Sequence, residues 1–205
     1  MKLSIVVFLL LFFCSVSFSQ PGRQKFKPVV SVGTRNTMSI FNSDKAMGKG
    51  IGGQFRVQFA SHLNSEWYFD YITSKRKTTG RNDYHIGWSL LFYTRNNFEF
   101  TKLFQPYFIA GHCFDEEQVF ELADKKNNAS RLSMATQAGL GTHINITEKF
   151  DGSLSGQYML HFGKEIETVF DDGKPVFTKA SHTQPDGHLL FTLSFNYKLF
   201  PRKSN

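Results

Sequence analysis

The sequence predicts an all-β fold: an eight-stranded antiparallel up-and-down transmembrane β-barrel that follows a cleaved signal peptide. The first observation is the segment Leu189–Leu199, where every odd position is apolar and four of the five even positions are polar. A period of two over about eleven residues is typical of a strand long enough to cross a bilayer. The second is that the same alternation recurs in earlier segments, and the third is an apolar run at the N-terminus.

The N-terminus predicts an exported protein. Residues 1–19 combine an early lysine, an unbroken apolar run and small residues up to Ser19, which is the pattern of a secretory signal peptide. We expect cleavage before Gln20 and a short periplasmic lead at 20–28; an uncleaved anchor is the alternative. Removal of the signal leaves Cys113 as the one cysteine of the mature chain, so no internal disulfide is expected.

Charge and composition narrow the classes of partner. The formal net charge of the full chain is +7, and loss of Lys2, the one charged residue of the signal, lowers it by one. The basic residues are scattered without a dense run, so nucleic acid is not expected as a partner. Outer-membrane lipid and anionic lipopolysaccharide fit better. The chain contains 23 Phe, which suits the lipid-facing wall and aromatic girdles of a barrel.

Four strands are predicted in the first half of the chain, because in each the apolar residues share one parity and the polar residues the other. Glycines between 48 and 53 mark the turn region after the first. The apolar faces are Val30, Val32, Met38 and Ile40 in 29–40; Phe55, Val57, Phe59 and Leu63 in 53–63; Trp67, Phe69 and Tyr71 in 67–75; and Tyr84, Ile86, Trp88, Leu90 and Phe92 in 83–93.

Four more strands are predicted in the second half. The segment 103–114 is the weakest, because both of its parities are apolar. The other three have clear apolar faces: Leu132, Met134, Ala138, Leu140, Ile144 and Ile146 in 131–147; Leu154, Tyr158, Leu160 and Phe162 in 152–162; and Leu189, Phe191, Leu193, Phe195, Tyr197 and Leu199 in 189–199.

The connections predict the topology. Short turns, one of them at 64–66, alternate with longer connections at 42–50, 75–82, 115–130 and 164–186. Short periplasmic turns and long extracellular loops alternate in this way in outer-membrane barrels. Both termini then lie in the periplasm, and an even number of strands closes the sheet so that no edge faces lipid. The barrel is expected at 29–200, followed by a C-terminal tail at 201–205.

A soluble eight-stranded barrel of the lipocalin type is the main competing fold. It would turn its apolar face inward, and alternation alone does not distinguish inside from outside. The aromatic character of the apolar face favours the membrane, as do charged residues such as Arg35, Arg56 and Asp70 on the polar face. The last strand also resembles the outer-membrane assembly signal, which is a final strand that ends in an aromatic residue. In this chain the aromatic residue is Phe200, and it is followed by five more residues.

The chain resembles the small outer-membrane β-barrel proteins of the Bacteroidota. The resemblance spans roughly 27–200 and rests on Gly50-Ile51-Gly52-Gly53-Gln54-Phe55-Arg56, on Glu66-Trp67, on Pro106-Tyr107 and the following segment 110–115, and on the final strand. These motifs are architectural. The resemblance implies a place in the bacterial cell outer membrane and assigns no activity.

The histidines are the one group of residues that suggests a bound ion. We expect His62, His85, His143, His161 and His188 on the polar faces of their strands. The face on which His112 lies is ambiguous, because both parities of its strand are apolar. The candidate site is a lumen cluster of His85, His112, His161 and His188 near Asp83, Asp115 and Asp186, since imidazole and carboxylate suit a transition metal. The favoured interpretation is polar filling of the lumen, with no metal and no cofactor.

An enzyme is not favoured. Lipid-deacylating barrels carry His and Ser two residues apart on one strand, and no such pair occurs here. Cys113 and His112 are adjacent, so they point to opposite faces and do not activate each other. Cys113 is expected to be a small apolar residue of the barrel wall. The predicted function is structural or interactive, through extracellular loops and a surface protein partner. The chain is porin-like in fold but not a general porin, because an eight-stranded lumen is filled by its own side chains. The alternatives are a narrow conduit or binder for a small or lipidic ligand, and then a lipid-modifying enzyme.

Overall fold

The computed structural model describes residues 28–41, 47–95 and 103–199, except for the side chains of 181–185. The predicted signal peptide at 1–19, nearly all of the lead at 20–28, Phe200 and the tail at 201–205 lie outside the described residues. No helix in the described part of the chain is long and apolar enough to cross a membrane.

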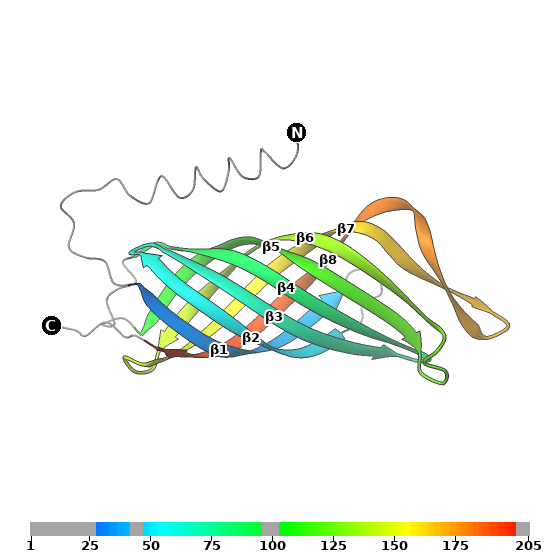
Figure 1. The fold of residues 1–205 in the computed structure, drawn as a ribbon, viewed down its shortest axis with the longest axis horizontal. Coiled ribbons are helices and arrows are strands. Elements are labelled where there is room, and N and C mark those ends of the chain that lie inside the picture. The colour runs from blue at the N-terminus through cyan, green and yellow to red at the C-terminus, as the bar shows by residue number, and fades with distance from the viewer. Residues whose placement is uncertain (1–27, 42–46, 96–102, 200–205) are drawn as a thin grey trace.

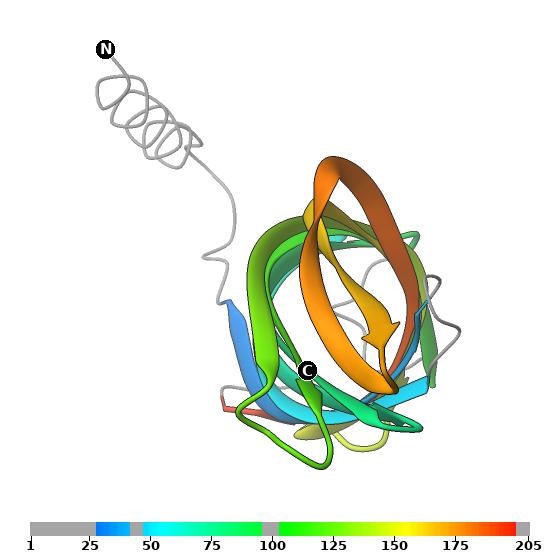
Figure 2. The ribbon, with the colours of Figure 1, turned by 90° about the vertical axis from the view of Figure 1, so that its right-hand side faces the viewer.

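Within these ranges the strands form one closed antiparallel barrel, in which sequence neighbours pair and the last strand returns to the first (Figures 1 and 2). This confirms the predicted eight-stranded up-and-down architecture. The strands are β1 (Val29–Phe41), β2 (Met47–Ala60), β3 (Leu63–Arg76), β4 (Thr79–Tyr93), β5 (Phe104–Glu121), β6 (Asn128–Asn145), β7 (Phe150–Asp171) and β8 (Lys174–Lys198).

The barrel has two distinct ends. The termini end holds the start of β1 and the end of β8, where Ser31 pairs with Lys198. The hairpin end holds the β3–β4, β5–β6 and β7–β8 turns, and the β7–β8 hairpin projects beyond the other strands (Figure 1). That hairpin turns at Asp172-Gly173, and both residues have positive φ, of 45° and 78°. Two successive positive φ angles give the mirror-image turn whose twist matches a hairpin.

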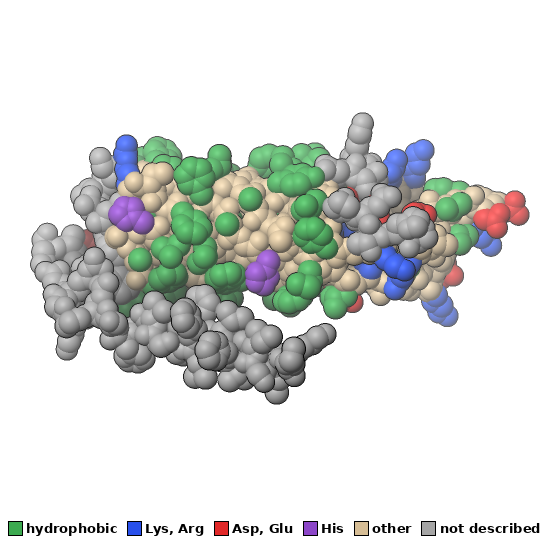
Figure 3. All heavy atoms as spheres, turned by 90° about the horizontal axis from the view of Figure 1, so that it is seen from above, with side chains coloured by type: hydrophobic (Ala, Val, Ile, Leu, Met, Phe, Trp, Pro, Cys, Tyr) green, Lys and Arg blue, Asp and Glu red, His purple; other side chains and the backbone are tan. Residues whose placement is uncertain are grey.

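The predicted parity of the strands agrees with the structure. Apolar residues such as Leu193 and Phe195 lie on the outer surface, whereas the alternating residues Ser194 and Asn196 are buried inside. Figure 3 shows hydrophobic side chains spread over the visible face of the barrel, with charged side chains gathered towards the hairpin end. A soluble barrel with an apolar interior would have the opposite arrangement.

One predicted turn is wrong. Asn64-Ser65-Glu66 begins β3 with all three residues buried, and the turn lies at Ser61-His62 instead. Polar residues that face a barrel lumen have the composition of a turn, which is why the sequence misled at this point. As a consequence His62 is exposed in the turn and does not face the lumen.

The predicted long connections are largely strand. Residues 47–50 belong to β2, the β3–β4 connection shrinks to Lys77-Thr78, and the β5–β6 connection to 122–127. The segment 164–186 is almost wholly β-hairpin, with a bulge between Lys164 and Ile166. Charges, Gly and Pro indicated loops there. In the structure these residues extend the strands past the apolar band, where both faces of a strand can be polar.

The weak alternation of the fifth predicted strand also has a structural reason. In β5 the inward residues Tyr107, Ile109 and Cys113 are apolar and buried. They belong to two small apolar clusters inside the barrel, one made of Leu91, Tyr93, Tyr107 and Ile109 and one that includes Cys113. Both parities are therefore apolar because this strand faces an apolar layer as well as the outer surface.

Candidate functional site in the barrel lumen

The lumen is the candidate site, because it gathers the buried charged side chains of the molecule. Towards the termini end they form a balanced network. Arg35 donates from Nε to Asp70 at 2.9 Å and from Nη1 to Glu66 at 3.1 Å. Arg56 donates from Nη2 to both carboxylate oxygens of Asp151 at 2.8 Å. Bidentate pairing of this kind holds the side chains in one geometry and fills the cross-section.

His143 belongs to this first network and not to a metal cluster. Both of its ring nitrogens lie within 3.0 Å of Arg56 Nη1, and its ring stacks on Tyr93 with centroids 5.6 Å apart. Since a guanidinium group does not accept hydrogen bonds, His143 serves as its acceptor. The structure therefore places His143 in the lumen, as the sequence predicts, with a packing role.

An apolar layer closes the middle of the lumen. It consists of Phe41, Tyr68, Ile72, Cys113, Ala135, Met159 and Leu190, all buried. Some of its backbone positions are fitted closely: a Cβ on Gly87 would lie 2.2 Å from the Tyr68 ring, so glycine is required where that ring lies against the wall. Cys113 packs as a small apolar residue, as expected, but it lies in this interior layer and not on the outer wall, because β5 turns its odd-numbered residues inward.

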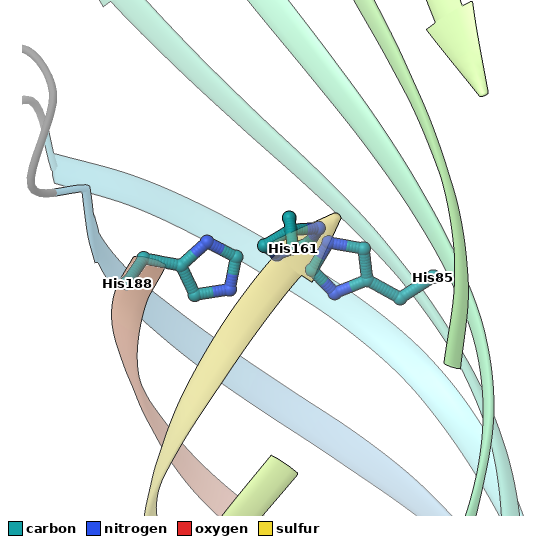
Figure 4. Close-up of side chains that lie close together, drawn as sticks. All are labelled: His85, His161 and His188. Carbon is teal, nitrogen blue, oxygen red and sulfur yellow. The ribbon is translucent and has the colours of Figure 1, made fainter. Parts of the chain in front are cut away.

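Above this layer, towards the hairpin end, three histidines meet. His85 comes from β4, His161 from β7 and His188 from β8, and Figure 4 shows their rings turned towards one another. The ring centroids are 4.8 Å apart for His161 and His188, 5.5 Å for His85 and His188 and 6.0 Å for His85 and His161. One ligand atom from each ring lies within 4.8 Å of the others. We call these three residues the histidine cluster.

Asp115 on β5 completes the surroundings of the cluster. Its Oδ2 lies 3.2 Å from His161 Nδ1, and its Oδ1 lies 3.1 Å from His85 Nε2. The second contact is close but lacks hydrogen-bond geometry, because both of its atoms are without a hydrogen-bond partner. Ser133 on β6, which the sequence analysis did not single out, donates to Asp115 Oδ2 at 3.3 Å. Ser133 has the inward-facing parity of β6, and this was the one sequence feature that could have indicated its position in the lumen.

The fourth predicted member of the cluster is elsewhere. His112 is exposed on the outer surface beside Trp88, with ring centroids 5.7 Å apart. In β5 the inward parity is that of Tyr107, Cys113 and Asp115, so an even-numbered residue faces outward. Because both parities of this strand are apolar, the sequence does not indicate which way His112 points. Asp115 itself was expected at the start of a loop and instead lies within β5.

The Ser133, His161 and Asp115 contacts do not make a nucleophilic triad. In a triad the histidine contacts the serine and the carboxylate through different ring nitrogens. Here Ser133 Oγ and Asp115 Oδ2 both approach His161 Nδ1, at 3.3 Å and 3.2 Å. Nδ1 cannot donate to the carboxylate and at the same time accept the serine proton, so the arrangement orients His161 rather than activating Ser133.

A mouth lies at the hairpin end above the histidine cluster. Arg81 pairs with Asp83 at 2.9 Å and with Glu117 at 3.2 Å, and Arg131 also contacts Glu117. Above these pairs is a cavity of about 620 Å³, lined by Arg81 and Glu117 below and by residues 165–170 of the β7–β8 hairpin. Figure 2 shows this hairpin arched across the opening of the barrel.

The tip of the hairpin is held in that position. Asn127 Nδ2 of the β5–β6 turn donates to Pro175 O at 2.8 Å and to Glu121 Oε2 at 2.9 Å. Ile166 on the inner side of the hairpin is buried, whereas Val169 and Phe170, which also line the mouth cavity, are exposed. The hairpin therefore packs towards the mouth through Ile166 and leaves apolar side chains near its tip exposed.

Comparison with known proteins identifies the fold alone. No family model matches the chain, and no curated protein matches it. Among solved structures it is similar to Neisserial surface protein A, with a TM-score of 0.57 and 12% identity over 84% of this chain and 97% of that one. The outer membrane protein OprG from Pseudomonas aeruginosa gives 0.55 and 17% over 87% and 98%. The outer membrane enzyme PagL gives 0.52 and 12% over 80% and 97%.

Proposed function

We propose that this protein is an outer-membrane β-barrel, exported through a cleaved signal peptide, that acts through its hairpin end in a structural or interaction role and not as a general porin. The observation that carries the proposal is the filled lumen. A buried ion-paired network occupies the termini end, and an apolar layer seals the middle. A conducting pore needs a continuous polar path, which wider barrels provide.

The outer surface supports the membrane location. Large hydrophobic side chains are exposed on every strand, among them Ile51, Ile86 and Leu132, which are 60% exposed or more. An apolar surface that encircles the molecule exceeds what a soluble monomer exposes. A bilayer covers it, and the inward polar residues then satisfy one another away from lipid. The termini end faces the periplasm and the hairpin end faces outside, because the longest element is at the hairpin end.

The β7–β8 hairpin is the proposed interaction element. Pairing of β7 with β6 ends at Phe162, and pairing of β8 with β1 ends at His188. Beyond these residues the two strands pair with each other in the described structure, so each has an outer edge open to another strand. Exposed edges bind extended partners by strand addition, and neighbouring apolar side chains such as Val169, Phe170 and Val176 provide specificity.

Two measurements on intact cells test this proposal. Lys174 and Lys179 of the hairpin were both expected trypsin sites, and Lys149 in the β6–β7 turn was expected to be spared. Lys174 precedes Pro175, and trypsin does not cut before proline, so the cut is expected after Lys179, which is exposed. Because Lys179 is β-paired with Ile166, this cut should be slow. Cleavage at Lys149 with Lys179 protected would invert the topology.

The second measurement is crosslinking. A photoreactive amino acid at Phe170 is expected to give a discrete protein adduct in intact outer membranes, whereas the same group at Leu154, in the middle of the apolar wall, should label lipid. Both side chains are about half exposed, at 57% and 52%, so the two positions are matched in access. Lipid labelling at both positions would contradict an interaction role for the hairpin.

The mouth cavity favours a second candidate, a binder for a small or lipidic ligand. Its volume of about 620 Å³ is in the range of small-molecule sites. The apolar floor argues for binding over conduction, and a ligand that co-purifies with the barrel would support this second candidate.

Lipopolysaccharide is the proposed lipid partner. A lipid-modifying enzyme ranks third, since Ser133 and His161 lack triad geometry, and membership of a Bacteroidota family rests on the quoted sequence motifs.

A further inference from the structure

We infer that His85, His161, His188 and Asp115 form a binding site for one divalent transition-metal ion, of the zinc type, inside the hairpin half of the lumen. The inference is independent of the interaction role proposed above. It rests on three observations: ligand atoms that converge, buried polar atoms without hydrogen-bond partners, and a local excess of negative charge.

The first observation is the convergence of ligand atoms from separate strands. One ring nitrogen from each of the three histidines lies within 4.8 Å of the other two. Two nitrogens bound to one tetrahedral zinc ion at its usual bond length are roughly 3.4 Å apart. Small rotations about χ1 and χ2 therefore bring the three rings onto a common ion without a change in the strands.

The second observation concerns hydrogen bonding. Nε2 of His161, Nε2 of His188 and Nδ1 of His85 are buried and have no hydrogen-bond partner among the described residues. His85 Nε2 and Asp115 Oδ1 also lack hydrogen-bond geometry, although they lie 3.1 Å from each other. Buried polar atoms normally are satisfied, so several in one place need a physical reason. A metal ion supplies it, because neutral imidazole nitrogen and carboxylate oxygen are zinc ligands.

The orientation of His161 fits a ligand in particular. Its Nδ1 lies 3.2 Å from Asp115 Oδ2, and Ser133 donates to the same oxygen. A carboxylate that accepts from one ring nitrogen fixes the tautomer and leaves the lone pair of the other nitrogen for a metal. In His161 that other nitrogen is Nε2, one of the atoms without a partner.

The third observation is charge. In the network towards the termini end, Arg35, Arg56 and Lys198 balance Glu66, Asp70 and Asp151. Around the histidine cluster the buried or nearly buried ion pairs contain two basic residues, Arg81 and Arg131, and four acidic ones, Asp83, Asp115, Glu117 and Asp186. These ion pairs thus carry two excess negative charges if the histidines are neutral. One divalent cation neutralises them, which lowers the cost of burying those carboxylates.

The cluster lies between an apolar layer and the charged mouth. The next inward-facing positions towards the termini end from Asp115, Ser133, His161 and His188 are Cys113, Ala135, Met159 and Leu190, which form an apolar floor. On the other side are Asp83 and Glu117, both paired with Arg81, and Glu117 lines the mouth cavity. The carboxylates on that side make the hairpin end the favoured direction of approach for a cation. Asp83, which groups with His85 and Asp115, is already paired with Arg81 and remains outside the ligand shell.

The test is metal binding by the mature, untagged, refolded protein in detergent. Titration with Co²⁺, read by the visible absorption of the nitrogen-ligated ion, and displacement by Zn²⁺ should give one ion per chain. H161Q and H188Q should each weaken binding at least 10-fold, and D115N by 10- to 100-fold, the range for residues that orient a ligand. H112Q, on the outer surface, is the matched control and should bind as the wild type does.

The folded state of each variant is checked by its heat-modifiable electrophoretic mobility. If the lumen variants do not fold, the electron paramagnetic resonance spectrum of Cu²⁺ bound to the wild type decides: coupling to imidazole nitrogens supports the site, and an oxygen-only ligand field contradicts it. The inference is also overturned if the wild type binds no Co²⁺, or if H112Q or H62Q weakens binding as much as H188Q does.

Discussion

Replacement of Leu193 by arginine tests which solvent the apolar face meets. The part of β8 that pairs with β1 runs from His188 to Lys198, and Leu193, opposite Asn36, is its centre. The Leu193 side chain is 41% exposed on the outer surface. In a bilayer this position is the midplane, where an arginine on the lipid face costs about 2–4 kcal/mol. That range lowers the folding equilibrium constant roughly 30- to 700-fold.

Leu199 is the matched control. It is 43% exposed, nearly the same as Leu193, and has the same parity six residues further on. At about 3.3 Å per residue and a tilt of about 40°, the two side chains differ in depth by roughly 15 Å. That distance is half the hydrocarbon thickness, so Leu199 lies at the interface, where an arginine costs about 0–1 kcal/mol.

The assay is equilibrium unfolding in lipid vesicles, with the folded fraction read from electrophoretic mobility before and after heating. L193R should lose about 2–4 kcal/mol of unfolding free energy and L199R less than about 1 kcal/mol. Equal and small losses would mean that Leu193 faces water, and the membrane argument would fail. Ser194 is unsuitable as an inward control, because it is buried and donates to Gln54 at 3.2 Å, so an arginine there overpacks the lumen.

Three further outcomes are expected. Asp151→Asn removes the charge partner of Arg56 and should cost about 3–5 kcal/mol of unfolding free energy; a loss below about 1 kcal/mol would show that the network is not structural. Gly87→Ala places a methyl group about 2.2 Å from the Tyr68 ring and should cost about 1–3 kcal/mol, whereas an unchanged urea midpoint would mean that the ring moves freely. Mass spectrometry of the protein from outer membranes should find Gln20 as the first residue, and retention of Met1 would refute the export argument.

The sequence predicts the architecture well because one simple constraint acts along each strand. Alternate residues of Leu189–Leu199 face two different surroundings, the lipid outside and the polar lumen inside. The period of two is therefore visible in the sequence without knowledge of which strands pair. The same constraint explains the two clearest errors. Asn64-Ser65-Glu66 is polar because it faces the lumen, and 164–186 is rich in charges because it lies beyond the apolar band. Polarity indicates the surroundings of a residue, and it was interpreted as an indication of a turn or loop.

The candidate site was predicted in part for a different reason. Parity places His85, His161 and His188 inside the barrel, but their meeting at one height depends on the stagger between strands, which the sequence does not reveal. His161 pairs with Asp186 on β8, while His188 pairs with Met159 and Phe41. The outward position of His112 and the role of Ser133 follow from register too. Register is set by turn geometry and bulges that alternation does not predict.

The central claim, that the odd residues of β8 face lipid and the even residues face a closed lumen, is tested most directly by photolabelling from the bilayer. The unmodified barrel is refolded into vesicles that contain a hydrophobic carbene-forming reagent, and after illumination the labelled residues among 191–196 are identified by tandem mass spectrometry. The structure predicts strong labelling at 191, 193 and 195 and weak labelling at 192, 194 and 196. Labelling of the even positions, or of none, would contradict the account.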